Sequence, residues 1–209
     1  MYKLFYSPGA CSMAVHVALN ETGAQYDLHK ATLHGAEKDA ELLKVNSRHA
    51  VPVLVDGDQV IREGAAILIH LLEKENSPLM PKADPLRAKA LEWLCWANAT
   101  LHPAYSVGFG VKGVSPEASV QEAVGKFACA KIQKLWDDVE QHLAQNKYLA
   151  GDQLTMGDIL MTVIANWSPK MPQPINIGPN VKRVLKDVVA RPAYQEALKS
   201  ENVEYKVAA

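Results

Sequence analysis

Cysteine is scarce in this chain of 209 residues, which has three: Cys11, Cys95 and Cys129. They form neither a C-x-x-C pair nor a metal-ligand spacing. A small, odd set excludes a structural disulfide framework and is typical of a reducing cytoplasm, where we expect the protein. The seven histidines are scattered along the chain, so neither a metal site nor a cofactor is predicted.

Long apolar runs and an excess of charge of one sign are also missing. No run reaches the roughly 18 residues that span a bilayer, and the N-terminus has the pattern of a strand rather than of a signal peptide. The formal net charge is −1, which removes the electrostatic case for nucleic acid or a membrane as a partner. The length suits one large domain or two small ones.

Two patterns of secondary structure divide the chain near residue 80. In the first part strands and helices alternate, and a mixed sheet covered by helices is predicted. Strands are expected at 2–6 and 26–30, helices at 12–22, 37–45 and 64–75, and a hairpin at 51–61 around an Asp-Gly turn.

Three prolines, Pro78, Pro81 and Pro85, predict a short stiff linker, after which the pattern is helical. Helices are expected at 86–107, 116–145, 181–189 and from Pro192, with another starting after Thr155. Thr155 and Asp158 have the spacing of a capping box. We therefore predict domains at 1–78 and 86–209, joined by the linker 79–85.

The most informative segment is residues 6–12, with the sequence YSPGACS. An apolar strand runs into a Pro-Gly turn, and Cys11 then directly precedes a helix. The partial positive charge and free N–H groups of a helix N-terminus favour a thiolate. A functional Cys11 with a lowered thiol pKa is therefore expected. The alternative is an ordinary small residue in a turn.

A second set of residues lies on one face of the long helix that begins at residue 86, because its members are three or four positions apart. They are Cys95, Asn98, His102, Tyr105 and Phe109. The stripe is either a partly buried packing seam or the wall of a cleft that faces the first domain. An imidazole near neutrality can exchange a proton with a thiol, and aromatic walls suit an apolar electrophile.

Taken together, these features resemble a cytosolic glutathione S-transferase over nearly the whole chain. The segment 6–12 and the sequence RPAY at 191–194 are most similar to the bacterial beta class. The resemblance implies an α/β thioredoxin-like N-terminal domain that binds glutathione and an all-α C-terminal domain that forms the acceptor pocket. It also implies a homodimer, with glutathione as co-substrate.

The resemblance also implies roles for residues of the first domain. Pro52 would form a cis peptide bond that turns the Val51 backbone toward the cysteinyl part of glutathione. Gly64 would let a carboxylate approach the free N–H groups of the next helix. Glu63 would face the γ-glutamyl ammonium, or is simply a first-turn acid that complements the helix dipole.

In the second domain, the resemblance places His102 near the glutathione sulfur and gives Tyr105, Phe109 and Trp167 to the acceptor pocket. Two positions depart from the class: Cys95 stands where asparagine is common, with Asn98 as a candidate replacement, and Pro103 follows His102 in place of a lysine. The residues that would meet the glycyl carboxylate are Lys38, Arg48 or His49.

Three functions compete. The first is conjugation of glutathione to apolar electrophiles, and the second is disulfide or peroxide reduction through Cys11. The third is a non-enzymatic glutathione- or protein-binding module on the same fold. The hydroxyls available to a thiolate are Ser12 and Tyr6, of which Tyr6 is expected to be structural. The presence of both Cys11 and His102 favours a transferase.

Overall fold

The computed structural model describes residues 1–33 and 37–207, which divide into two compact units. The sheet unit comprises residues 1–82 and 190–204, and the helical unit comprises residues 83–189 and the chain from Tyr205 on. Residues 34–36 and the last two residues of the predicted second domain lie outside the described residues. Residues 190–204, which were expected in the second domain, group with the sheet unit.

Within the described residues, the sheet unit contains a four-stranded mixed sheet in the order β2-β1-β3-β4. Its strands are β1 (Tyr2–Tyr6), β2 (Tyr26–Lys30), β3 (Val53–Asp56) and β4 (Gln59–Arg62). β1 pairs parallel with β2 and antiparallel with β3, and the β3–β4 hairpin closes at Gly57. This is the mixed sheet that the sequence predicted.

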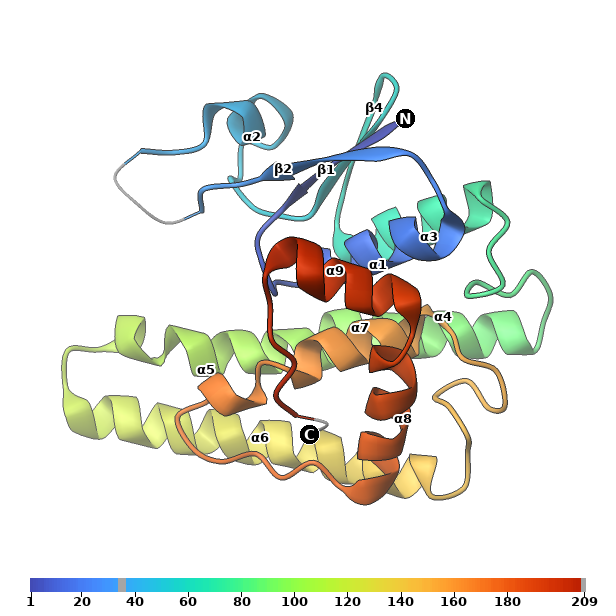
Figure 1. The fold of residues 1–209 in the computed structure, drawn as a ribbon. Coiled ribbons are helices and arrows are strands. Elements are labelled where there is room, and N and C mark those ends of the chain that lie inside the picture. The colour runs from blue at the N-terminus through green and yellow to red at the C-terminus, as the bar shows by residue number, and fades with distance from the viewer. Residues whose placement is uncertain (34–36, 208–209) are drawn as a thin grey trace. The chain divides into compact units, whose positions relative to one another are not determined.

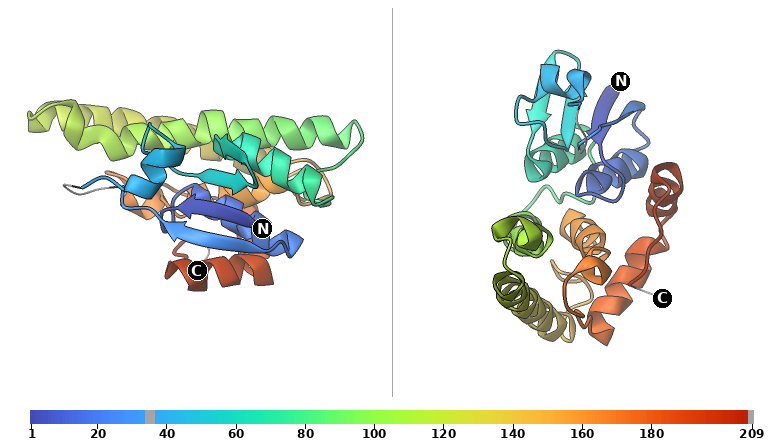
Figure 2. Two further views of the ribbon diagram at one scale, coloured as in Figure 1. Left: turned by 90° about the horizontal axis from the view of Figure 1, so that it is seen from above. Right: turned by 90° about the vertical axis from the view of Figure 1, so that its left-hand side faces the viewer.

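The helices of this unit are α1 (Ser12–Thr22), α2 (Ala40–Val45), α3 (Gly64–Lys74) and α9 (Pro192–Glu201). α1 and α3 lie side by side on one face of the sheet (Figures 1 and 2). α9 packs against α1 from the end of the chain, and Arg191 binds both carboxylate oxygens of Glu21 at 2.5 and 2.7 Å. Every residue from Ser12 to Leu19 is consequently buried.

Helix α2 is shorter than predicted, because it starts at Ala40 rather than at residue 37. Asp39 caps it, and its Oδ1 accepts the backbone N–H of Leu42 at 2.9 Å. An N-cap of this kind marks the beginning of the helix, and the residues before it take no part in the helical hydrogen bonds.

The helical unit contains α4 (Leu86–Trp96), a π-helical turn (Ala97–Leu101), α5 (His102–Val114), α6 (Ala118–Leu143), α7 (Met156–Ala165), a 3-10 turn (Ser168–Lys170) and α8 (Pro179–Val189). α5 and α6 form an antiparallel hairpin (Figure 1). α7 is buried along its whole length, as expected for a central helix that is apolar on all sides. Among the described residues, no helix is both long and apolar enough to cross a membrane.

The capping box that the sequence predicted at α7 is present. Asp158 accepts the backbone N–H groups of Thr155 at 2.8 Å and of Leu149 at 2.9 Å, so it also ties the preceding loop to the helix. Burial raises the pKa of Asp158 to about 6, although these hydrogen bonds act in the opposite direction.

Candidate active site

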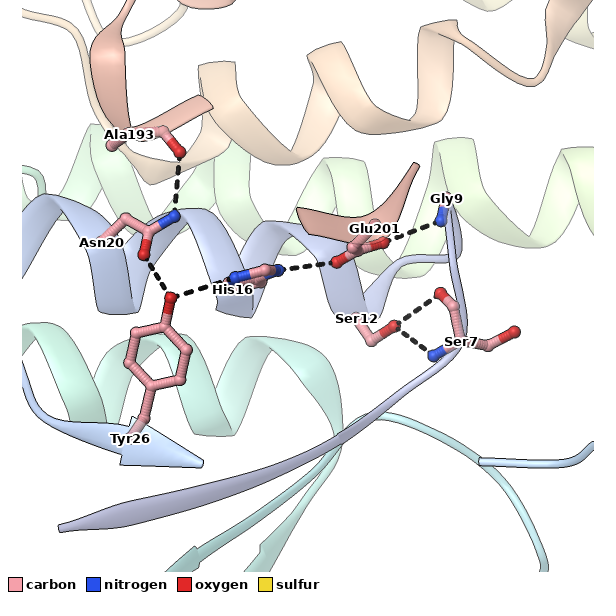
Figure 3. A network of polar contacts seen from close by, with 8 residues as sticks. All are labelled: Ser7, Gly9, Ser12, His16, Asn20, Tyr26, Ala193 and Glu201. Carbon is pink, nitrogen blue, oxygen red and sulfur yellow. Dashed lines mark hydrogen bonds and ion pairs between the residues drawn. The ribbon is translucent and has the colours of Figure 1, made fainter. Parts of the chain in front are cut away.

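Cys11 ends the turn that connects β1 to α1, and it is the N-cap residue of α1. The turn requires Gly9, whose φ of +67° is in the left-handed region. The buried hydroxyl of Ser12 closes the turn, because it accepts the N–H of Ser7 at 3.1 Å and donates to the Ser7 carbonyl at 3.2 Å (Figure 3). Strand, turn and helix thus hold Cys11 in one position.

The thiol of Cys11 lies beside the loop that precedes β3. Its Sγ donates to the carbonyl oxygen of Val51 at 3.9 Å. The Val51–Pro52 peptide bond is cis, as the resemblance implied. The two segments are 40 residues apart in the chain, and their contact brings together the two motifs expected to bind the cysteinyl part of glutathione.

The expectation of a lowered thiol pKa for Cys11 is wrong for this structure. Burial raises the pKa of Cys11 to about 11, and the backbone N–H groups of Cys11 and Ser12 lower it by less than burial raises it. The negative charge of Glu63 raises it further. The helix N-terminus does act in the expected direction, but desolvation outweighs it. Cys11 is therefore a neutral thiol near pH 7 and can donate a hydrogen bond.

Glu63 and Gly64 stand at the start of α3. Glu63 is the N-cap residue with a φ of 73°, and its side chain makes no capping hydrogen bond, so the first N–H groups of α3 have no side-chain cap. Its Oε1 instead pairs with Arg48 Nη2 at 2.9 Å, and both side chains are more than half exposed. An exposed pair of opposite charges next to an uncapped helix end can bind a zwitterionic ligand.

The structure separates the three candidates for the glycyl carboxylate. Lys38 is exposed. His49 has a φ of 53°, and its Nε2 accepts the backbone N–H of Asp39 at 3.0 Å. Arg48 lies two positions after Asn46, whose Oδ1 accepts the Arg48 N–H at 3.2 Å. Arg48 thus combines a fixed backbone with an exposed guanidinium beside the site.

The two candidate hydroxyls are both enclosed. Ser12 has no exposed surface, and its Oγ is bonded to Ser7, as described above. Tyr6 is 7% exposed, and its ring contacts that of His16 at a centroid distance of 6.2 Å. Burial raises the pKa of Tyr6 above its ordinary value. The structural role expected for Tyr6 agrees with this position, and Ser12 shares it.

A buried polar network behind Cys11 was not found by sequence reasoning. Glu201, on α9, accepts the N–H of Gly9 at 2.9 Å and pairs with Nδ1 of His16 on α1 at 2.9 Å (Figure 3). Nε2 of His16 lies 3.1 Å from the hydroxyl of Tyr26. The side chains of Glu201 and His16 have no exposed surface. The network fixes the turn that carries Cys11 to the last helix of the chain.

In the helical unit, His102 opens α5 directly after the π-helical turn. Pro103 follows and lacks the N–H that would bond to the carbonyl four residues earlier, which accounts for the interruption of the helical ladder here. The sequence had predicted one uninterrupted helix at 86–107. His102 is half-buried, and burial lowers its pKa. Asn98 is half-buried, whereas Cys95 is exposed.

The expected aromatic residues gather around Trp167. Its ring centroid lies 5.0 Å from that of His102, 5.9 Å from Tyr105 and 5.8 Å from Phe109. Tyr105 is fully buried, and its hydroxyl bonds to Ser168 at 2.6 Å and accepts Nε1–H of Trp136 at 2.7 Å. Tyr105 therefore supports Trp167 from within the core, whereas the ring of Phe109 is 49% exposed.

The sequence of this chain is similar to those of known proteins. The family model of the glutathione S-transferase N-terminal domain matches residues 1–73, and that of the C-terminal domain matches residues 107–192. Glutathione S-transferase 3 of Zea mays is 32% identical over 211 residues, covering 95% of this chain and 92% of that protein. Glutathione S-transferase GstA of Escherichia coli O157:H7 is 26% identical and covers 97% and 100%.

Solved structures give the same result. A glutathione S-transferase from Xylella fastidiosa has a TM-score of 0.88 at 27% identity and covers 98% of this chain and 100% of that one. A beta-class glutathione S-transferase of Sphingomonas chungbukensis has a TM-score of 0.82 at 27% identity, with 97% and 100% covered. The roles of individual side chains stay predictions, because none of these comparisons tests a residue.

Proposed function

Because the chain belongs to the glutathione S-transferase family, we propose that its sheet unit binds glutathione and that the enzyme joins the glutathione thiol to an apolar electrophile as a thioether. The observation that carries this proposal is the contact of the Cys11 thiol with the carbonyl of Val51, next to the cis bond to Pro52. It combines a hydrogen-bond donor for sulfur with a backbone that can pair with a peptide.

Each part of glutathione has a partner in this proposal. The backbone of Val51 pairs with the cysteinyl residue. The N–H groups at the start of α3, beginning with Gly64, bind the γ-glutamyl carboxylate, and Glu63 binds the neighbouring ammonium. Arg48 is favoured over Lys38 and His49 for the glycyl carboxylate, because Asn46 holds the Arg48 backbone and the guanidinium is exposed.

The proposed chemistry divides the work between Cys11 and His102. His102, kept neutral by the burial that lowers its pKa, accepts the proton of the glutathione thiol. The neutral S–H of Cys11 donates to the thiolate that results and stabilises it. The thiolate then forms the carbon–sulfur bond, and the leaving group departs with its electron pair. A thiol with a raised pKa is a poor nucleophile at pH 7, which favours conjugation over disulfide reduction through Cys11.

Replacement of Cys11 tests this assignment. Cys11→Ala is expected to lower kcat/KM for conjugation about tenfold, the size of one hydrogen bond to a charged group. Cys11→Ser keeps a donor at the same position and should retain most of the activity. Steady-state kinetics with a neutral aryl halide measure both variants. Full activity of Cys11→Ala would mean that other hydrogen-bond donors stabilise the glutathione thiolate.

Gly64 is tested by a substitution that fills the helix end. Gly64→Leu is expected to weaken glutathione binding at least tenfold, because a side chain occupies the space that a carboxylate needs above the N–H groups of α3. Titration calorimetry measures the dissociation constant, and Ala66→Leu, two positions further on the exposed side of α3, is the control. Unchanged affinity in Gly64→Leu would remove this helix end from the site.

We also propose that the protein is a homodimer in the cytoplasm. The three cysteines are free thiols, which suits a reducing compartment. The α5–α6 hairpin exposes large apolar side chains: Val107 is 42% exposed, Val114 55% and Phe127 69%. Such side chains favour burial against a second copy. Sedimentation at micromolar concentration is expected to give roughly twice the chain mass of 22.9 kDa, and a fully active monomer would contradict the proposal.

A further inference from the structure

The loop 46–50 joins the short helix α2 to Val51 and the cis bond to Pro52. It also carries Arg48, the residue proposed for the glycyl carboxylate of glutathione. Within this loop His49 has a φ of 53°, in the left-handed region that favours glycine. A side chain as large as imidazole at such a position indicates that the contacts around it hold the backbone there.

One of these contacts joins His49 to the start of α2. Its Nε2 accepts the backbone N–H of Asp39, the N-cap residue of the helix, at 3.0 Å. In a capping box, a glutamate or glutamine at the third position of the helix accepts this N–H. In α2 the third position is Leu42, whose side chain has no acceptor and is fully buried. His49 therefore supplies from the loop the acceptor that the helix itself lacks.

Asp39 is held firmly at the other end of this bond. Its Oδ1 accepts the N–H of Leu42 at 2.9 Å. Its Oδ2 lies 2.9 Å from Nε2 of His29 on β2 and accepts the N–H of Thr32 at 3.2 Å. These bonds lower the pKa of Asp39 to about 2, so the carboxylate keeps its charge and its partners at neutral pH. The residue that binds His49 is thus tied to the sheet as well as to α2.

Asn46 fixes the chain on both sides of His49. It is 3% exposed, and its N–H donates to the carbonyl of Leu42 at 2.7 Å, where α2 ends. Its Oδ1 accepts the N–H of Arg48 at 3.2 Å, and its Nδ2 donates to the carbonyl of Ala50 at 2.8 Å. Asn46 thus ties the loop to the end of α2, and the ring of His49 ties it to the start of the same helix.

We propose that His49 is a positioning residue for glutathione: its bond to Asp39 holds the loop so that the Arg48 guanidinium and the Val51 backbone are in place for the tripeptide. A loop that is ordered before the ligand arrives loses less conformational entropy on binding. The effect is therefore on the affinity for glutathione and not on the chemical step. This role rests on the proposed function, whereas the Asp39–His49 bond does not.

The test removes the ring and leaves a residue that keeps the left-handed φ without strain. His49→Gly is expected to raise the KM for glutathione about fivefold, the size of one hydrogen bond, without changing kcat at saturating glutathione or the KM for a neutral aryl halide. His49→Gln places a side-chain oxygen at a reach similar to that of Nε2 and should restore most of the affinity. Ser47→Gly loosens an exposed position of the same loop and, as the control, should stay within about twofold of wild type.

A second measurement needs no ligand. Hydrogen exchange of the Asp39 amide, followed by NMR, should be about tenfold faster in His49→Gly than in wild type and should slow again in His49→Gln. Equal exchange in wild type and His49→Gly would overturn the bond.

Faster exchange with an unchanged KM for glutathione would overturn the positioning role, and so would a loss of kcat in His49→Gly that His49→Gln does not restore. A wild-type protein that binds no glutathione would contradict the proposed function itself, and the exchange of the Asp39 amide would still decide whether the bond forms.

Discussion

Iodoacetamide at pH 7 is expected to alkylate Cys11 of the ligand-free protein about a hundred times more slowly than an ordinary thiol, because burial raises the pKa of Cys11 from 9.0 to about 11. The reagent reacts with the thiolate, and two pH units correspond to a hundredfold smaller thiolate fraction. The reaction is slower because a raised thiol pKa keeps the proton on sulfur at neutral pH.

Mass spectrometry of the Cys11 peptide over time measures this rate, and the exposed Cys95 provides an internal control in the same sample. A pH series separates ionisation from access. If ionisation limits the reaction, the Cys11 rate is still rising between pH 8 and pH 10, whereas limited access alone lowers the rate without moving its pH dependence. A plateau below pH 8 would mean that the helix N-terminus prevails over burial.

A slow Cys11 has a consequence for the chemistry. A mixed disulfide with glutathione requires the thiolate of Cys11 to attack a disulfide sulfur, and this step slows with the thiolate fraction. Donation of an S–H hydrogen bond requires the neutral thiol, which is the form that the buried site maintains. The same pKa shift thus disfavours one of the two chemistries that the motif YSPGACS allows and favours the other.

Glu201→Ala is expected to lower the free energy of unfolding by about 1–3 kcal/mol, the range for leaving a buried polar group without its hydrogen-bond partner. The substitution removes an acceptor of the Gly9 N–H and the partner of His16, and the His16 side chain is fully buried, so water does not replace its lost bond. Urea denaturation with an unchanged m-value measures the effect.

Two variants on α9 accompany it. Glu201→Gln keeps an acceptor for Gly9 and should lose less than half as much stability, whereas Glu196→Ala removes an exposed carboxylate of the same helix and should be nearly neutral. Because the Gly9 turn carries Cys11, Glu201→Ala should also reduce kcat/KM under conditions where the protein stays folded. A loss of stability without any change in kcat/KM would mean that the network only holds α9 against α1 and does not position Cys11.

Local signals in the sequence determined the secondary structure and the motif positions well. Strands β1 and β2 and helix α1 lie where the apolar periodicity predicted them. The Asp-Gly turn produced the β3–β4 hairpin, and Thr155 and Asp158 produced the capping box of α7. In each case the deciding interactions join residues a few positions apart, so the pattern contains the information.

The predicted bounds of two helices were wrong because a single residue sets each of them. One residue contributes little to a pattern of apolar periodicity. Asp39 starts α2 three residues later than predicted, through one hydrogen bond to Leu42. Pro103 interrupts the long helix with a π-helical turn, although the chain continues as a helix to Val114. Apolar periodicity averages over a window and therefore does not resolve such points.

The environment of the site was decided by the tertiary structure alone. Glu201 and Gly9 are 192 positions apart in the chain, and the sequence around neither residue predicts their hydrogen bond. The direction of the Cys11 pKa shift depends on how much protein surrounds the thiol, a quantity that a helix N-terminus in the sequence does not contain. Tyr105 and Phe109 share one predicted stripe, yet packing buries the first and exposes the second. Periodicity assigns residues to a face, whereas desolvation and long-range partners exist only once the chain has folded.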